Sequence, residues 1–311
     1  MSLTVVGSVA FDSVETPFGS RERMLGGSAT HFALAGRFFT DVRIVGVVGR
    51  DFTDDHVDVL RTRGVNTDDL ERVSDGDTFF WAGRYSWDLN SRDTLDTQLN
   101  VFADFQPKLS QESREARVLF LGNIQPDLQR EVRGQCDRAA FVALDSMNLW
   151  IDIARDSLIE TIRGVDCVIL NDAEARQLTE EPNLARAARR IREWGPEIVV
   201  AKQGEYGAAL FTDSGFFSLP GYPLETVVDP TGAGDTFAGG FVGFLAAHAG
   251  SLPSDDLYRC AMTYGSVVAS FNVEEFGTER VQRLTMDEVE ERFSEFERMT
   301  SFERVPLPGR A

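Results

Sequence analysis

Residues 229–241 read DPTGAGDTFAGGF, and the interpretation of the whole chain starts from this stretch. Phe237 and Phe241 recur at helical spacing, so we predict a helix that begins near Asp235 and packs inward. The glycines before it allow close approach of a ligand, and free amides at the positive end of a helix bind phosphate. Asp235 fits either a helix N-cap or a base beside that phosphate, and the second carboxylate, Asp229, favours the base.

Composition narrows the class of protein. The chain has 311 residues and is 42% hydrophobic, which is enough for a large packed core. Its net charge of −19 argues against nucleic acid and anionic membranes as partners. Three cysteines lie far apart without a CxxC motif, and the N-terminus lacks a signal-peptide pattern. We therefore expect a cytoplasmic protein without a disulfide framework or a zinc site.

Missing motifs exclude other enzyme classes. The only lysines are Lys108 and Lys202, and neither follows a glycine, so a P-loop NTPase is excluded. The sequence contains no HExxH and no GxSxG, the motifs of common metalloproteases and esterases. The acidic, lysine-poor composition is consistent with a salt-rich cytoplasm and equally with GC-rich codon usage, and both explanations stay open.

Alternating strand and helix patterns predict the fold class. Short apolar, mostly β-branched runs are typical of buried strands, and helical patterns separate them. The predicted strands are Leu3–Val6, Val42–Val48, Val118–Leu121, Phe141–Leu144, Cys167–Leu170 and Ile198–Ala201. The predicted helices are Ala29–Phe39, Asp54–Gly64, Ala173–Leu178 and Asn183–Trp194. This order predicts a doubly wound α/β fold with a mostly parallel central sheet and helices on both faces.

Two segments interrupt that pattern. Residues 13–25 and 76–106 are rich in aromatic, Thr and polar residues that favour strands, and we expect them to form a small β-sheet lid. The whole chain, 1–311, is then a single domain with a discontinuous lid. In such folds ligands bind beyond the carboxyl ends of the strands, where Asp12, Asn123, Asp145 and Asn171 are expected.

The stretch around Asp235 resembles the C-terminal signature of the ribokinase-like (PfkB) carbohydrate kinase family, and other segments resemble the family in the same order. Residues 7–12, GSVAFD, are similar to its first strand with a substrate-binding aspartate. MLGGSATHFALA at 24–35 is similar to its N-terminal signature. The other similar segments are GVVGRDF at 46–52, RGVNTDDL at 63–70, NDAE at 171–174, KQGEYGA at 202–208 and the helix and loop 261–277.

The resemblance implies ATP-dependent phosphorylation of a hydroxymethyl group on a sugar or nucleoside. It gives Asp235 the role of general base and assigns the γ-phosphate to the amides of Gly232, Ala233, Gly234 and Asp235. Asn171 and Glu174 would order waters around Mg²⁺, although the pair is equally typical of a capped helix start. The remaining nucleotide-binding residues expected from the resemblance are Lys202, Gly204, Gly207 and Asn272, with an ordinary surface lysine as the alternative for Lys202.

On the acceptor side the resemblance implies Asp12, Gly26, Gly27, His31, Asn123 and the lid residue Arg84 as substrate-binding residues. Gly26-Gly27 is read as a hinge between lid and core, with a plain tight turn as the alternative. His31 stands where the family often has asparagine, so it either contacts the substrate or fills the helix face. Asp229 and the carbonyl of Thr231 match a place where family members bind a monovalent cation, which suggests K⁺.

Two rival functions remain from the residues alone. A Rossmann oxidoreductase is disfavoured because no GxGxxG follows the first strand. A non-catalytic sugar sensor on a kinase scaffold is disfavoured by the intact Asp235, although a fold alone never proves turnover. We expect a homodimer through the lid, because exposed sheet edges are commonly covered by pairing.

Overall fold

A nine-stranded sheet forms the centre of the computed structural model, which describes residues 2–250 and 254–305. Its strand order is β13-β12-β11-β10-β9-β8-β1-β4-β5. Neighbouring strands from β11 to β5 are parallel, and β12 and β13 join antiparallel at one edge. The strands are β1 (Ser2–Val6), β4 (Asp41–Val48), β5 (Asn66–Arg72), β8 (Val118–Leu121), β9 (Phe141–Asp145), β10 (Cys167–Asn171), β11 (Ile198–Lys202), β12 (Ala208–Thr212) and β13 (Gly215–Leu219).

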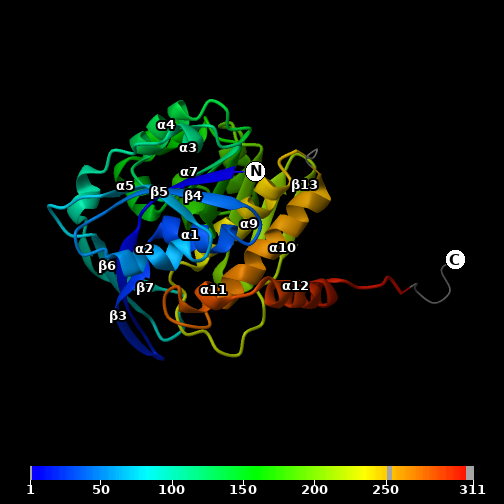
Figure 1. The fold of residues 1–311 in the computed structure, drawn as a ribbon. Helices are drawn as coiled ribbons and strands as arrows, with labels where there is room; N and C mark the ends of the chain where they lie inside the picture. The colour runs from blue at the N-terminus through cyan, green and yellow to red at the C-terminus, as the bar shows by residue number, and fades with distance from the viewer. Residues whose placement is uncertain (1, 251–253, 306–311) are drawn as a thin grey trace.

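Helices cover both faces of this sheet, because its central strands are apolar on both sides (Figure 1). One face packs against α1 (Ser28–Gly36), α2 (Asp54–Arg61), α9 (Ala233–Ala247), α10 (Asp255–Asn272), α11 (Glu279–Arg283) and α12 (Met286–Thr300). The other packs against α4 (Pro126–Gln135), α5 (Asn148–Ile153), α6 (Arg155–Ile162), α7 (Asp172–Thr179) and α8 (Leu184–Arg192). The short α3 (Gln111–Arg114) lies against β1, where the Thr4 hydroxyl donates a hydrogen bond to the carbonyl of Ser113 at 3.0 Å.

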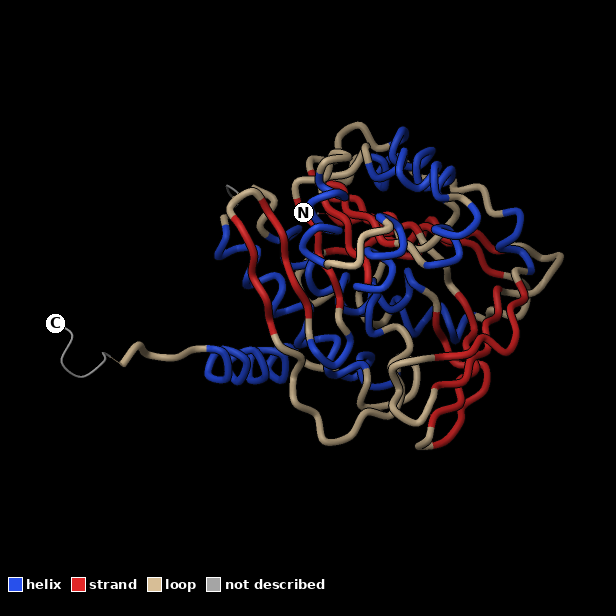
Figure 2. Tube along the Cα trace, turned by 180° about the vertical axis from the view of Figure 1, so that it is seen from behind, coloured by secondary structure: helices blue, strands red, loops and turns tan. Residues whose placement is uncertain are grey.

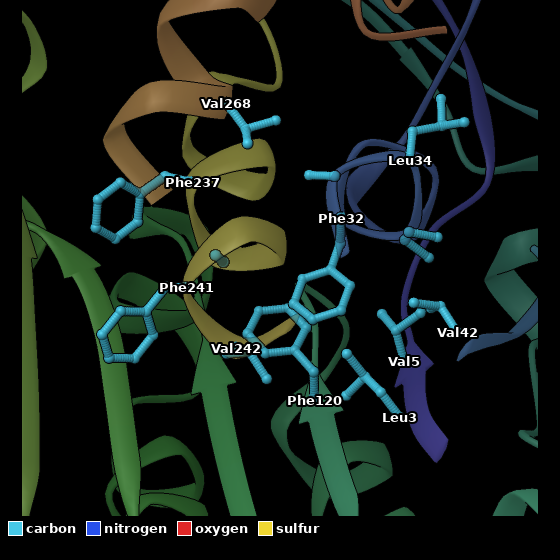
Figure 3. Packing of buried hydrophobic residues seen from close by; sticks show 14 of the residues in the cluster. Leu3, Val5, Phe32, Leu34, Val42, Phe120, Phe237, Phe241, Val242 and Val268 are labelled. Atoms are coloured by element: carbon cyan, nitrogen blue, oxygen red, sulfur yellow. The ribbon is translucent and has the colours of Figure 1, made fainter. Parts of the chain in front are cut away.

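The core under α1 and α9 is built from large apolar side chains. Phe32 of α1 stacks on Phe120 of β8 with ring centroids 4.1 Å apart, and Val242 of α9 joins the same layer (Figure 3). Each of these three side chains is fully buried, and burial of such a side chain contributes about 1.5–3 kcal/mol. This packing fixes α9 against the sheet and α1, and therefore fixes the position of its first turn.

A separate four-stranded sheet forms the lid. Its order is β3-β2-β6-β7, with β2 and β6 parallel and the outer pairs antiparallel. The strands are β2 (Ala10–Thr16), β3 (Gly19–Gly26), β6 (Phe79–Tyr85) and β7 (Arg92–Gln98), followed by a 3₁₀ turn η1 (Asn100–Asp104). The lid lies apart from the main sheet at the lower right of Figure 2. Its inner face packs Val14 and Tyr85 against Phe276 of the core.

The predicted α/β fold with a β-sheet lid is confirmed. The predicted helices Ala29–Phe39 and Asp54–Gly64 are shorter, since α1 and α2 end at Gly36 and Arg61. β5, β12 and β13 were not predicted as strands, because their polar or glycine-flanked sequences lack the continuous apolar run of the inner strands. Within the described residues, none of the helices combines the length and apolar character of a membrane span.

Candidate active site

The first turn of α9 is shaped by glycine. Gly232 is the N-cap, with φ +72°, and a Cβ atom there would lie 2.3 Å from Cε1 of the His31 ring, so only glycine fits. The amide of Ala233 donates to the carbonyl of Pro230 at 3.2 Å. The amides of Gly234 and Asp235 have no backbone acceptor in the described part of the chain. They lie at the positive end of α9, where an anion is favoured.

Asp235 is the third residue of α9, so it is not the N-cap that was the alternative interpretation of its sequence. Burial raises the pKa of its carboxyl, and the charges of Lys202 and Arg92 oppose that rise. This direction is the reverse of the one expected from the helix N-terminus alone, because loss of solvent outweighs the helix. Asp235 is thus a buried carboxyl with two cations nearby, which is an environment typical of a catalytic acid or base.

Lys202 is not a surface lysine. Its Nζ lies 2.9 Å from Oδ2 of Asp145, and the two side chains are only 16% and 6% exposed. A Cβ atom on Gly234 would lie 3.0 Å from the same Nζ, so the ammonium group rests against the first turn of α9. The other oxygen of Asp145 accepts a hydrogen bond from the amide of Ser146 at 2.7 Å. β11 and β9 therefore deliver an ion pair to the glycine turn.

Asn171 and Glu174 form a capping box at the start of α7. The Glu174 amide donates to Asn171 Oδ1 at 2.7 Å, and the Asn171 amide donates to Glu174 Oε2 at 2.8 Å. The helix-start interpretation of this pair is therefore correct as geometry. Burial and the charge of Asp145 raise the pKa of Glu174 to about 7, while Lys202 opposes the rise. The acids Glu174 and Asp145 are therefore close enough for the charge of Asp145 to disfavour the ionised form of Glu174. Their oxygens are a suitable donor set for Mg²⁺, which needs few protein ligands.

The acceptor side contains Asp12 and the two glycines. Asp12 is 7% exposed, and burial raises its pKa to about 7, although a backbone hydrogen bond with Gly27 lowers it. A Cβ atom on Gly26 would lie 2.0 Å from Oδ2 of Asp12. Gly27 has φ +92°, and a Cβ atom there would lie 2.5 Å from the carbonyl oxygen of Ser8. There is therefore no room for a side chain at either glycine, which is a requirement separate from the hinge role expected of them.

His31 and Asn272 meet beneath Gly232. His31 is 2% exposed, its Nδ1 lies 3.1 Å from Asn272 Oδ1, and its buried Nε2 has no hydrogen-bond partner among the described residues. Asn272 is fully buried, accepts from Thr236 Oγ1 at 3.1 Å and donates to the Thr231 carbonyl at 2.8 Å. The side chain expected to meet the nucleotide is therefore engaged inside the protein.

Other predicted residues also have protein partners. Asn123 accepts from Trp150 Nε1 at 2.9 Å. The two oxygens of Asp229 accept from the amides of Thr231 and Gly277, each at 2.9 Å. Asp229 thus links the loop before α9 to the loop after α10 through these two hydrogen bonds. Binding of K⁺ at Asp229 and Thr231 stays a prediction. Gly204 and Gly207 bound the short turn η2 (Gly204–Tyr206) after β11, with φ values of +58° and +93°.

Arg84 is not brought to the site. It pairs with Glu15 at 2.5 Å and is exposed, whereas the next residue, Tyr85, is buried and accepts a hydrogen bond from Thr231 Oγ1 at 3.2 Å. Successive strand residues point to opposite faces, so Arg84 lies on the outer face of the lid. The lid arginine on the inner face is Arg92, which pairs in register with Tyr85. Sequence reasoning missed Arg92, and it placed Asp145 at this edge of the sheet without giving it a role.

This arrangement defines a phosphotransferase of ribokinase-like architecture, and comparison with known proteins gives its family. Residues 3–283 match the model described as pfkB family carbohydrate kinase, and the chain belongs to that family. It is 30% identical over 275 residues to a cytidine kinase of Thermococcus kodakarensis, covering 84% of this chain and 94% of the relative.

Two solved structures share the fold. The nucleoside kinase of Burkholderia thailandensis in complex with inosine superposes with a TM-score of 0.75 at 19% identity, covering 94% of this chain and 97% of that one. A putative ribokinase II from E. coli in complex with ATP and Mg²⁺ gives a TM-score of 0.75 at 18% identity, covering 94% and 99%. These two likenesses show the fold, while the family match and the cytidine kinase relative show that the chain is a kinase of the pfkB family.

Proposed function

We propose that the protein is an ATP-dependent nucleoside kinase that phosphorylates the hydroxymethyl group of its acceptor, with Asp235 as the general base. The position of Asp235 carries the proposal. It is the third residue after the glycine N-cap, shares the first turn with the amide of Gly234, which has no backbone acceptor in the described part of the chain, and lies close enough to Lys202 for that charge to lower its pKa. The similarity to a cytidine kinase supports a nucleoside rather than a free sugar as acceptor.

The reaction follows from this geometry. The acceptor hydroxyl gives its proton to the Asp235 carboxylate as its oxygen bonds to the γ-phosphorus. The bond from the γ-phosphorus to the bridging oxygen then breaks, and ADP leaves. The amides of the first turn of α9 and the ammonium group of Lys202 stabilise the negative charge on the transferring group. Glu174 and Asp145 are the residues that would hold Mg²⁺, and the ion would supply further charge neutralisation on the phosphates.

An ADP-release assay over a panel of nucleosides and sugars tests the proposal. Cytidine, uridine, inosine and adenosine are compared with ribose, fructose and 2-keto-3-deoxygluconate. We expect turnover with one or more nucleosides at a higher kcat/KM than with any sugar. The proposed acceptor class is refuted if a sugar is preferred, and a protein that binds acceptors without releasing ADP is a sensor.

Asp235→Asn tests the assignment of the base. Asparagine keeps the shape of the side chain but cannot accept the proton, so kcat should fall by about 10²–10⁴-fold while ATP still binds. Asp256→Asn is the matched control, because Asp256 is an exposed acid in the first turn of α10. A kcat of Asp235→Asn close to that of the control contradicts the role of base.

A further inference from the structure

The inner face of the lid brings a second cation to the site. Arg92 of β7 pairs in register with Tyr85 of β6, and directly opposite residues on antiparallel strands project from the same face. The hydroxyl of Tyr85 lies 3.2 Å from Thr231 Oγ1, one residue before the N-cap of α9. The face that carries Arg92 is therefore the face that meets the first turn of α9.

The charge of Arg92 affects three carboxyls of the site. It lowers the pKa of Asp12, Glu174 and Asp235, in each case against the larger effect of burial. This direction agrees with the register and the Tyr85–Thr231 contact, which place Arg92 on the lid face toward the first turn of α9.

Arg92 is nevertheless not used in an ion pair. Across residues 2–250 and 254–305, no carboxylate lies within salt-bridge distance of it. Its guanidinium carbon lies 5.3 Å from the centre of the Trp81 ring, on the same strand pair. A guanidinium group held by an aromatic ring and a phenol keeps N–H donors for a ligand, and its planar fork matches phosphate oxygens.

We propose that Arg92 is a catalytic arginine, delivered by the lid, that donates hydrogen bonds to the nonbridging oxygens of the transferring phosphoryl group. The inference rests on the proposed function and adds a residue from a different element to the same site. No bond to Arg92 forms or breaks. The acceptor oxygen bonds to the γ-phosphorus, its proton passes to Asp235, and ADP takes the electrons of the broken bond, while Arg92 and Lys202 neutralise charge from opposite sides.

The chain offers a matched control on the same lid. Arg84 lies on the outer face and pairs with Glu15, so Arg84→Ala removes an arginine from the same sheet without touching the site. We expect Arg92→Ala to lower kcat by about 10²–10³-fold, less than the largest arginine-finger effects because Lys202 remains. Arg92→Lys should recover only part of the rate, and added guanidinium ion should partly rescue Arg92→Ala but not Asp235→Asn.

Two results would overturn the inference in kinetics. The first is a kcat of Arg92→Ala within about threefold of the control, including the case in which only the KM of the acceptor rises, which would make Arg92 a binding residue. The second is an equal loss in Arg84→Ala and Arg92→Ala, which would show that both variants simply damage the lid.

A binding measurement tests Arg92 without any acceptor. ADP with Mg²⁺ and aluminium fluoride mimics the transferring phosphoryl group, and isothermal titration calorimetry gives its Kd. Arg92→Ala should weaken binding of the mimic by roughly the factor lost in kcat, with the Kd of ADP alone unchanged. Unchanged affinity for the mimic refutes the inference. If the wild type phosphorylates no nucleoside, the proposed function fails separately, and this measurement still decides the role of Arg92.

Discussion

Replacing Lys202 with methionine tests how much the buried ion pair between Lys202 and Asp145 contributes to the free energy of unfolding. Methionine keeps the length of the side chain but removes the charge, so Asp145 is left buried without its cation. Both side chains are largely buried, at 16% and 6% exposed. Breaking such a pair by removing one partner costs about 3–5 kcal/mol. We expect the free energy of unfolding of Lys202→Met to fall by roughly 3 kcal/mol or more at pH 8.

The loss should depend on pH. Burial raises the pKa of Asp145, and the charge of Lys202 is the largest influence that lowers it, so the variant should have a still higher folded-state pKa. Between the unfolded and folded pKa values the folded protein binds more protons than the unfolded chain, and the free energy of unfolding therefore falls as pH rises. Lys202→Met should be close to wild type at pH 5 and far below it at pH 8.

Urea denaturation at pH 5 and pH 8 measures this, with a double-mutant cycle on Lys202→Met and Asp145→Asn. The double variant should regain most of the lost stability, because no uncompensated charge remains. Lys108→Met is the control, since Lys108 pairs with Glu71 at the surface, where such pairs contribute about 0–1 kcal/mol. A Lys202→Met stability equal to that of Lys108→Met at pH 8 refutes the reasoning. In kinetics, Lys202→Met should raise the KM for ATP more than that for the acceptor.

Two further predictions concern the acceptor side. Gly27→Ala should lower Tm as well as activity, because a Cβ atom would lie 2.5 Å from the Ser8 carbonyl oxygen, whereas Gly64→Ala, at φ +82° with nothing within 4 Å, should cost only about 1–2 kcal/mol of backbone strain. Thermal melts in which the two variants lose the same Tm would contradict this. Asp12→Asn should flatten the pH dependence of Tm between pH 5 and pH 8. The raised pKa of Asp12, from 3.8 to about 7, makes the wild type less stable as pH rises through that window, by about 3 kcal/mol. Identical slopes of Tm against pH would show that Asp12 is not responsible.

The sequence was most informative where one residue type meets a local need. The six inner strands could be predicted because a strand buried on both faces must be almost continuously apolar. The glycine turn before α9 could be predicted because only glycine takes its positive φ and allows the close approach of His31 and Lys202. The edge strands β5 and β13 lack such a pattern, since part of each strand is exposed, and β12, one place in from β13, is a short buried run that directly follows Gly207.

Contacts between distant segments were beyond the sequence. Asp145 and Lys202 are 57 positions apart and meet only because β9 and β11 flank the same strand, β10. Of the two lid arginines, Arg84 was selected and Arg92 was missed. Alternation along a strand says that neighbours point apart, but not which face meets the core. That choice is made by Tyr85, whose contact with Thr231 turns its own face inward.

Three elements that are remote in sequence converge on the turn before α9. The lid contacts the side chain of Thr231 through Tyr85, α10 holds the carbonyl of Thr231 through Asn272, and α1 presses the His31 ring against Gly232. The amides of Gly234 and Asp235, which have no backbone acceptor among the described residues, follow directly along the backbone, so a shift in any of the three contacts changes the direction in which they point. Burial lowers the pKa of His31, so its contact with Asn272 stays that of a neutral ring near neutral pH. Since misplacement by about 1 Å can cost about 10²-fold in rate, we expect the fold to act in catalysis chiefly by keeping this turn in place, and the lid to contribute to that through Tyr85 as well as through the role proposed for Arg92.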